Sequence, residues 1–280
     1  MKTKSALSYF GSDSEVAEQL AGFLDDCKHV TIPFVGGGSI LPYLRARAIV
    51  ANDLNELAIN FYRVMSDRCG AGSRDELIRR CQTTLSHPSE MQSALMLLAE
   101  PSLEASFIEL AWAYWAVCWI GRKGKGGTKS VGGMPSIRRT ANGGTNASRI
   151  RAAADDLQAW AKHFERCEWE SIDFRKLIPK VSDSVGCGIY CDPPWRGLGN
   201  GYLHSFSDQD HYDLEKMLGW FSDTKIVVRY GDDEYIRKLY SNHRWTIIGA
   251  ESRTQTNVVK GELWIVNNAD IPNAGGKPSE

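Results

Sequence analysis

The sequence lacks the features that define several broad protein classes. Its 33 basic and 34 acidic residues nearly cancel, which excludes a globally basic, histone-like binder. The longest apolar run, Leu110 to Ile120, is shorter than the roughly 20 residues that a membrane-spanning helix needs. The first residues include two lysines but no apolar stretch after them, so we expect no signal peptide. No internal repeat is present.

The cysteines provide neither a disulfide framework nor a zinc site. There are seven of them, scattered along the chain without a C-x-x-C pair or a Cys/His cluster. We therefore expect reduced thiols in a cytoplasmic protein that requires no metal. With 280 residues, of which 42% are hydrophobic and 24% charged, the chain suits one large globular domain or a domain with a sizeable insertion.

Acidic residues are absent from one long internal segment. Residues 110–154 contain none, and eight glycines lie between Gly121 and Gly144. We interpret this region as a flexible or hairpin-like basic loop within a helical insertion. Arginine and lysine can neutralise phosphates, and arginine and asparagine can read base edges, so the region favours nucleic-acid binding over a merely solvated loop. The candidate DNA-binding residues are Arg122, Lys123, Lys125, Lys129, Arg138, Arg139, Asn142, Arg149 and Arg151.

On both sides of this region, short apolar runs alternate with amphipathic patterns, which is typical of an α/β sheet. Strands are expected at 29–35, 48–51, 167–172, 186–191, 225–230, 245–250 and 262–267. Helices are expected at 14–27, 40–47, 55–68 and 207–221, with others in the insertion. Ser12-x-x-Glu15 is a candidate capping box for the first helix, and Ser207-x-x-Asp210 opens the last. The final two strands predict an antiparallel hairpin.

Two strand ends carry the pattern of a site for an adenosine-bearing cofactor. The first strand ends in Pro33-Phe34-Val35-Gly36-Gly37-Gly38-Ser39, a turn whose backbone N–H groups can approach a ligand closely. Asp53 follows the second strand and can accept hydrogen bonds from both hydroxyls of a ribose. It can equally cap the next helix. This pattern alone does not distinguish a dinucleotide from S-adenosylmethionine.

A third strand end, Asp192-Pro193-Pro194-Trp195, predicts the substrate. Two prolines fix the backbone and remove two N–H donors, so the outward groups are the Asp192 carboxylate and the Pro193 carbonyl. Both are acceptors, and Trp195 adds a flat stacking surface. Such a pocket suits the exocyclic amino group of a planar base, which must be flipped out of a duplex to enter. The plain alternative is an ordinary turn with a core tryptophan.

Together these motifs resemble the DNA adenine N6-methyltransferases, a Dam-like, S-adenosylmethionine-dependent family with the catalytic motif D/N/S-P-P-Y/F/W. The order is similar too, with the cofactor motif first, a target-recognition region inserted, and the catalytic motif last, over roughly 9–267. The resemblance implies an α/β fold, a Rossmann-like seven-stranded class I methyltransferase sheet with an inserted, mainly helical target-recognition region. We expect the catalytic domain at 1–62 and 163–270, the inserted region at 63–162, and a disordered tail at 271–280.

The resemblance also implies the ligands and a role for each matching residue. The cofactor is S-adenosylmethionine, which leaves as S-adenosylhomocysteine, and the partner is double-stranded DNA. A cognate restriction endonuclease and action on a nucleoid, or in a phage-infected cell, fit the same family. Cofactor contacts are implied for Tyr9, Phe10, Gly11, Pro33, Phe34, Val35, Gly36, Gly38, Ser39, Asp53 (ribose), Asp173 (adenine amino group), Phe174 and Asp192. The catalytic residues are implied to be Asp192, Pro193, Pro194 and Trp195.

Three positions depart from the family pattern. Ile32 stands where the family has glutamate, and Asp13 stands where it has lysine, both near the cofactor. Trp195 replaces the commoner tyrosine, which preserves stacking. The same D-P-P-W occurs in RNA adenine methyltransferases, but their motif order is usually the reverse of this one. The alternatives are an RNA adenine or a DNA cytosine-N4 methyltransferase, or a catalytically impaired DNA-binding relative. A nicotinamide-dependent oxidoreductase is more distant.

Overall fold

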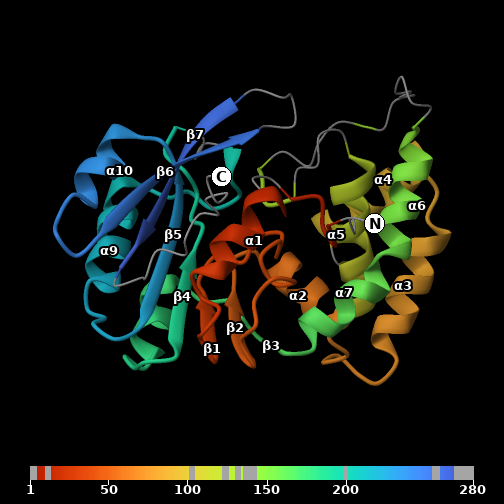
Figure 1. Ribbon diagram of the computed structural model, residues 1–280. Coiled ribbons are helices and arrows are strands. Elements are labelled where there is room, and N and C mark those ends of the chain that lie inside the picture. The colour runs from red at the N-terminus through yellow and green to blue at the C-terminus, as the bar shows by residue number, and fades with distance from the viewer. Residues whose placement is uncertain are drawn as a thin grey trace, which may run out of the picture.

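One mixed sheet organises the part of the chain that the computed structural model describes, residues 5–9, 14–100, 105–121, 126–129, 134, 144–197, 201–253 and 259–267. Within these residues its seven strands lie in the order β3-β2-β1-β4-β5-β7-β6 (Figure 1). Neighbours from β3 to β5 are parallel, and β7 is antiparallel to β5 and β6. The strands are β1 (His29–Ile32), β2 (Ala48–Asn52), β3 (Cys167–Glu170), β4 (Cys187–Cys191), β5 (Lys225–Gly231), β6 (Thr246–Arg253) and β7 (Val259–Val266).

Helices cover both faces of the sheet because its strands alternate apolar side chains between the faces. In β4, Ile189 and Cys191 pack into one core and Tyr190 packs into the other. The helices are α1 (Ser14–Gly22), α2 (Glu56–Met65), α3 (Ser73–Thr83), α4 (Pro88–Ala99), α5 (Phe107–Ile120), α6 (Asn146–Asp155), α7 (Leu157–Phe164), α8 (Phe174–Leu177), α9 (Asp208–Leu218) and α10 (Glu234–Leu239). A short 3₁₀ turn, Ile178–Lys180, follows α8.

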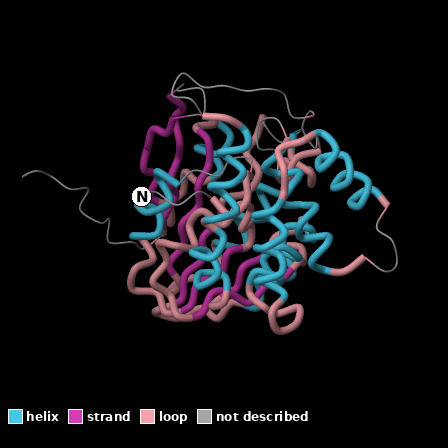
Figure 2. The backbone as a smooth tube through the Cα atoms, turned by 90° about the vertical axis from the view of Figure 1, so that its right-hand side faces the viewer, coloured by secondary structure: helices cyan, strands magenta, loops and turns pink. Residues whose placement is uncertain are grey.

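The helices α3 to α7 form the insertion between β2 and β3, and they gather beyond the β3 side of the sheet (Figure 1). In Figure 2 the molecule is turned so that this side faces the viewer. At their centre lies α5, which packs against α2, α3, α4 and α6. Every residue of α5 from Ala111 to Ile120 is buried, so its long apolar run is core rather than a membrane segment. Among the described residues, no helix has the length and apolar character to span a membrane.

Most of the expected architecture is confirmed. Each expected strand is present, with ends shifted by no more than three residues, and β6 and β7 form the expected antiparallel hairpin. Ser207 and Asp210 form a reciprocal capping box at the start of α9. Ser12, of the other expected box, lies outside the described residues. The domain boundaries expected at 62 and 163 fall inside α2 and α7, so continuous helices carry the chain across both.

The expected helix at 40–47 is wrong. This segment forms turns, in which the N–H of Tyr43 bonds to the carbonyl of Ile40 only three residues before it. Pro42 explains the difference, because proline has no N–H and disfavours the helical conformation of the residue before it. The guanidinium of Arg166 donates to carbonyls of this segment instead, including that of Leu41 at 2.6 Å and that of Leu44 at 2.9 Å.

Candidate active site

The turn after β1 is fixed to the end of β2. Gly36 and Gly38 have positive φ angles of 49° and 67°, which favour glycine. The N–H of Gly36 donates to Oδ2 of Asp53 at 2.9 Å, and the N–H of Asn55 donates to Oδ1 of Asp53 at 2.9 Å. Tyr62 from α2 donates its hydroxyl to the carbonyl of Gly36 at 2.6 Å. Asp53 therefore lies next to the glycine turn and also holds it in place through these hydrogen bonds.

Asn52 joins the ends of three parallel strands. It is the last residue of β2 and is almost fully buried. Its amide nitrogen donates to the carbonyl of Pro33 after β1 and to that of Ile172 after β3, both at 2.9 Å. Its side-chain oxygen accepts the N–H of Ile172 at 2.9 Å. The segments of the implied cofactor site are thereby locked together at the carboxyl edge of the sheet.

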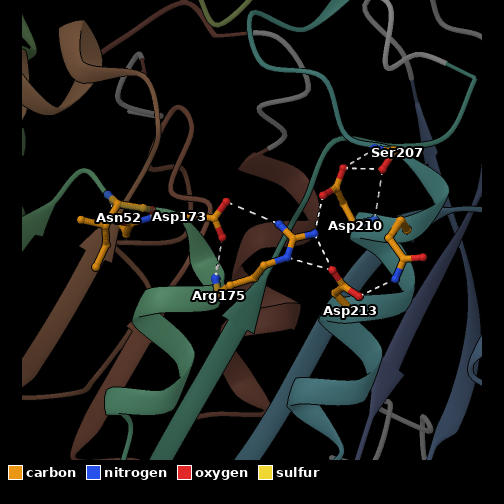
Figure 3. A network of polar contacts seen from close by, with 8 residues as sticks. Asn52, Asp173, Arg175, Ser207, Asp210 and Asp213 are labelled. Atoms are coloured by element: carbon orange, nitrogen blue, oxygen red, sulfur yellow. Dashed lines mark hydrogen bonds and ion pairs between the residues drawn. The ribbon is translucent and has the colours of Figure 1, made fainter.

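Asp173 lies beside Asn52 and caps α8 (Figure 3). Its Oδ1 accepts the N–H of Arg175 at 2.7 Å, and its Oδ2 lies 3.4 Å from Nη1 of the same arginine. The Arg175 guanidinium also reaches Asp210 at 2.5 Å and Asp213 at 2.7 Å on α9. The Asp173 side chain stays 38% exposed, so it can still accept a hydrogen bond from a ligand.

Three aromatic rings connect the implied cofactor segments with the segment after the catalytic motif. The ring centroid of Phe34 lies 5.5 Å from that of Phe174 and 5.5 Å from that of Phe206. Phe174 and Phe206 are 5.7 Å apart. Phe34 follows β1, Phe174 begins α8 and Phe206 precedes α9, so residues far apart in the sequence meet here. Val35 and Pro33 are buried, while Ser39 is partly exposed.

The catalytic motif follows β4 at the same edge of the sheet. Oδ1 of Asp192 accepts the indole N–H of Trp195 at 3.2 Å, and Oδ2 accepts from Nη1 of Arg229 at 3.2 Å. Burial raises the pKa of Asp192, while the Arg229 charge opposes that rise. Pro193 is buried, and Pro194 and Trp195 are partly exposed. The four residues thus form one fixed side of the candidate site, which we call the catalytic wall. Its carboxylate is held by hydrogen bonds from Trp195 and Arg229.

A short piece of the insertion lies between the N-terminal segment and the loop after the catalytic motif. Gly126 forms a bridge with Tyr9, and Thr128 forms one with Tyr202. A Cβ atom on Gly127 would lie 2.4 Å from Cε1 of Tyr9, so only glycine fits against that ring. The Tyr9 hydroxyl accepts from the Asn55 amide at 3.3 Å. Tyr9 is therefore tied both to the insertion and to the residues beside Asp53.

The candidate DNA-binding residues that the structure describes differ in their surroundings. Lys129 is exposed, and its N–H donates to the carbonyl of Gly201 at 3.1 Å, close to the catalytic motif. Arg151 on α6 is exposed. Arg149 donates to the carbonyl of Trp119 at 2.6 Å and packs over its ring, which also anchors α6 to α5. The predicted site residues outside the described part of the chain are Phe10, Gly11, Arg122, Lys123, Lys125, Arg138, Arg139 and Asn142.

Some functional candidates were not predicted from the sequence. Arg229 lies within the apolar strand β5 and contacts Asp192, and Glu262 in β7 pairs with it. A charged residue inside an apolar run was the available signal, because such residues are seldom buried without a partner.

Ile32, at the family's glutamate position, is fully buried in the core, so it packs the sheet rather than facing a ligand. In the described residues no cluster of three or more His, Cys, Asp or Glu could hold a metal.

The strand order, the glycine turn and the acidic residues at consecutive strand ends are those expected of a Rossmann-like class I methyltransferase fold. A family model for the D12 class of N6 adenine-specific DNA methyltransferases matches residues 9–255. The chain therefore belongs to this family, whose members use S-adenosylmethionine to methylate adenine in DNA. The Rossmann-like class I fold, the cofactor and the adenine specificity expected from the sequence are confirmed.

Several known proteins are similar to this chain. A retron DNA adenine methylase from Escherichia coli is 27% identical over 116 residues, which cover 37% of this chain and 40% of that protein. A DNA adenine methylase from Vibrio cholerae is 22% identical over 273 residues, 91% of each chain. Among solved structures, magnesium protoporphyrin IX methyltransferase from Synechocystis aligns over 91% of this chain and 79% of its own, at 10% identity and a TM-score of 0.37.

Proposed function

We propose that the protein is a site-specific methyltransferase that methylates N6 of an adenine flipped out of double-stranded DNA. The observation that carries this proposal is the position of Asp192-Pro193-Pro194-Trp195 at the carboxyl end of β4, which pairs directly with β1 and its glycine turn. A base bound at the motif would thus lie next to the cofactor. The Asp192 side chain is only 25% exposed, so a base inside an intact duplex cannot reach it without flipping.

The residues present fit S-adenosylmethionine. Each oxygen of Asp53 accepts one backbone N–H and keeps a second acceptor position for a ribose hydroxyl. The 38% exposed carboxylate of Asp173 can accept from the adenine amino group. The turn around Gly36 and Gly38 offers close backbone approach without a Cβ. When bound, the cofactor supplies an electrophilic methyl group on a sulfonium sulfur.

The catalytic wall acts by orientation and electrostatics. Asp192 and the Pro193 carbonyl each accept a hydrogen bond from one N–H of the target amino group. These two hydrogen bonds turn the nitrogen lone pair away from conjugation with the ring. Trp195 stacks on the base and holds its plane. These contacts are fixed before the substrate arrives, so little reorganisation is needed during the reaction. Neither a covalent intermediate on the protein nor a metal is needed in this mechanism.

We assign the catalytic domain to 1–62 and 163–270 and target recognition to 63–162. Support comes from the placement of residues 126–129, which bridge Tyr9 and Tyr202 and so bring the insertion to the catalytic motif. The residues after 267 lie outside the described part of the chain. We also propose action in the cytoplasm on nucleoid or phage DNA and pairing with a cognate restriction endonuclease, and both rest on the resemblance to the family.

The direct test is methylation with methyl-labelled S-adenosylmethionine on duplex DNA, single-stranded DNA and RNA in separate reactions. We expect N6-methyladenine from duplex DNA, identified by the mass of the released nucleosides. Mapping the labelled sites should then give one short recognition sequence. Label found in RNA would instead indicate an RNA methyltransferase, and label found as N4-methylcytosine would indicate a DNA cytosine-N4 methyltransferase. A protein that binds cofactor and DNA without transferring label would be a catalytically impaired relative.

Substitutions of exposed cations should weaken DNA binding without affecting the fold. We expect Lys129→Ala and Arg151→Ala each to lower the affinity for duplex DNA by about the same factor for all sequences. Each should also reduce the slope of log K against log salt concentration by about one. Fluorescence anisotropy over a salt series measures both effects. The matched control is Lys180→Ala, an exposed lysine at the end of the 3₁₀ turn that follows α8, outside the inserted region. Unchanged affinity in both variants would remove these residues from the interface.

A further inference from the structure

The strands behind the catalytic motif carry two buried charges that the mechanism above leaves unused. The side chain of Arg229 is 3% exposed and that of Glu262 is 1% exposed. Nε of Arg229 donates to Oε2 of Glu262 at 2.9 Å, and Nη2 donates to Oε1 at 2.6 Å. A buried ion pair often stabilises a fold less than apolar side chains of similar volume would. Stability alone therefore does not account for this pair.

The pair lies directly behind Asp192. Nη1 of Arg229, the nitrogen outside the two-bond contact with Glu262, donates to Oδ2 of Asp192 at 3.2 Å. Trp195 donates its indole N–H to Oδ1 of Asp192 at 3.2 Å. Both carboxylate oxygens are thus held from within the protein, and each retains an acceptor position for a substrate amino group. The direction of the carboxylate depends on these two donors.

The strand geometry shows why Arg229 reaches both Asp192 and Trp195. Alternate residues of a strand point to the same face, so Arg229 and Gly231 lie on one face of β5. The guanidinium carbon of Arg229 lies 5.4 Å from the Trp195 ring centroid. A Cβ on Gly231 would lie 2.7 Å from Cε3 of Trp195, so the ring packs flush on the strand. Glu262 pairs with Gly231 across β5 and β7, which places its carboxylate beside the guanidinium.

We propose that Arg229 and Glu262 are positioning residues: Arg229 keeps the Asp192 carboxylate ionised and aimed at the amino group of the target base, and Glu262 holds the Arg229 guanidinium in place. This inference rests on the proposed function of Asp192. Arg229 supplies the cation. Glu262 fixes the plane of the guanidinium and partly neutralises its charge. Together the three groups carry one net negative charge. That charge favours an amino nitrogen that becomes positive as the methyl group moves to it from sulfur and that then releases one proton to water.

The two positioning residues have opposite effects on the pKa of Asp192. Burial raises this pKa, the charge of Arg229 lowers it, and Glu262 raises it. The ionised carboxylate accepts a hydrogen bond from the target amino group much better than the protonated carboxyl does, so the methylation rate should fall as the pH drops through the pKa. Among the described residues, the ionisable groups that interact with the Asp192 carboxylate are Arg229, Glu262, Tyr190, Cys191, Tyr202 and Tyr230.

The test compares Arg229→Met, Glu262→Gln and the double variant with the unmodified protein. Single-turnover methylation rates are measured against pH, with DNA and S-adenosylmethionine saturating. The pH at the midpoint of the acidic limb should be highest in Arg229→Met and lower in the double variant. It should be lower again in the unmodified protein and lowest in Glu262→Gln. We expect the Arg229→Met limb to move up by about one pH unit or more, a tenfold change in the ionisation constant.

A purely structural role would lower the rate by the same factor at every pH and leave the limb in place, and that result would overturn the inference. The double variant carries the same test if Arg229→Met does not fold, because it removes both buried charges together. Arg229→Lys should restore the limb but not the full rate, since lysine keeps the charge and loses the planar fork. S-adenosylmethionine affinity, measured by calorimetry, should stay unchanged throughout. An unmodified protein without activity overturns the proposed function itself.

Discussion

Asp192→Ala should abolish DNA methylation while leaving the affinity for S-adenosylmethionine almost unchanged. The carboxylate is held by Arg229 and Trp195 at the carboxyl end of β4, where it can accept an amino hydrogen of the target base. Loss of a preorganised contact to the reacting group lowers rates by about 10²- to 10³-fold in other enzymes. We expect at least that loss here, because the same side chain also orients the nucleophile. Incorporation of labelled methyl groups under single-turnover conditions measures it.

Two further variants make the Asp192 test specific. Asp192→Asn keeps one acceptor oxygen and should retain more activity than Asp192→Ala, although its amide nitrogen must face one of the two existing donors. Trp195→Ala removes the stacking ring together with one of the two donors that hold Asp192, so it should weaken capture of the flipped base and also lower the methylation rate. Calorimetric titration with S-adenosylmethionine is the control for each. A large loss of cofactor affinity in Asp192→Ala would place this carboxylate in the cofactor site instead of on the substrate.

The sequence predicted the parts of the site that depend on local pattern. Apolar runs that end in Asp53, Asp173 and Asp192 mark strand ends, and parallel strands bring their carboxyl ends to one edge. Once the strands were assigned, the meeting of these carboxylates followed from topology. The capping box at Ser207 was predictable for the same reason, since only residues three apart are involved.

The parts that escaped prediction depend on contacts between distant segments. Nothing near Gly127 indicates that it packs on Tyr9, because the two residues lie in separate segments joined only by the fold. Arg149 looked like a DNA contact from its basic surroundings, yet its guanidinium also holds the Trp119 carbonyl. Charge composition identifies a region that favours nucleic acid, but it cannot separate cations that face solvent from those that brace helices. The partnership of Arg229 with Asp192 was hidden in the same way.

Asp53→Ala should weaken S-adenosylmethionine binding by about 100-fold or more, because hydrogen bonds to a charged acceptor contribute about 1.5–3 kcal/mol each. The carboxylate orders the glycine turn through the N–H of Gly36 and is the proposed acceptor for the ribose hydroxyls. Burial raises the pKa of Asp53, so affinity in the unmodified protein should begin to fall on acidification at a higher pH than for an exposed aspartate. Calorimetric titration over a pH series measures both effects.

The two roles of Asp53 can be separated with a cofactor analogue. S-adenosylhomocysteine and its 2′-deoxy form differ by one ribose hydroxyl, so their affinity ratio reports the contact with that hydroxyl. The ratio should be large in the unmodified protein and close to one in Asp53→Ala. Tyr62→Phe loosens the turn by removing the hydrogen bond to the Gly36 carbonyl, and it should lower both affinities while keeping the ratio. If Asp53→Ala also keeps the ratio, Asp53 orders the turn and another group binds the ribose.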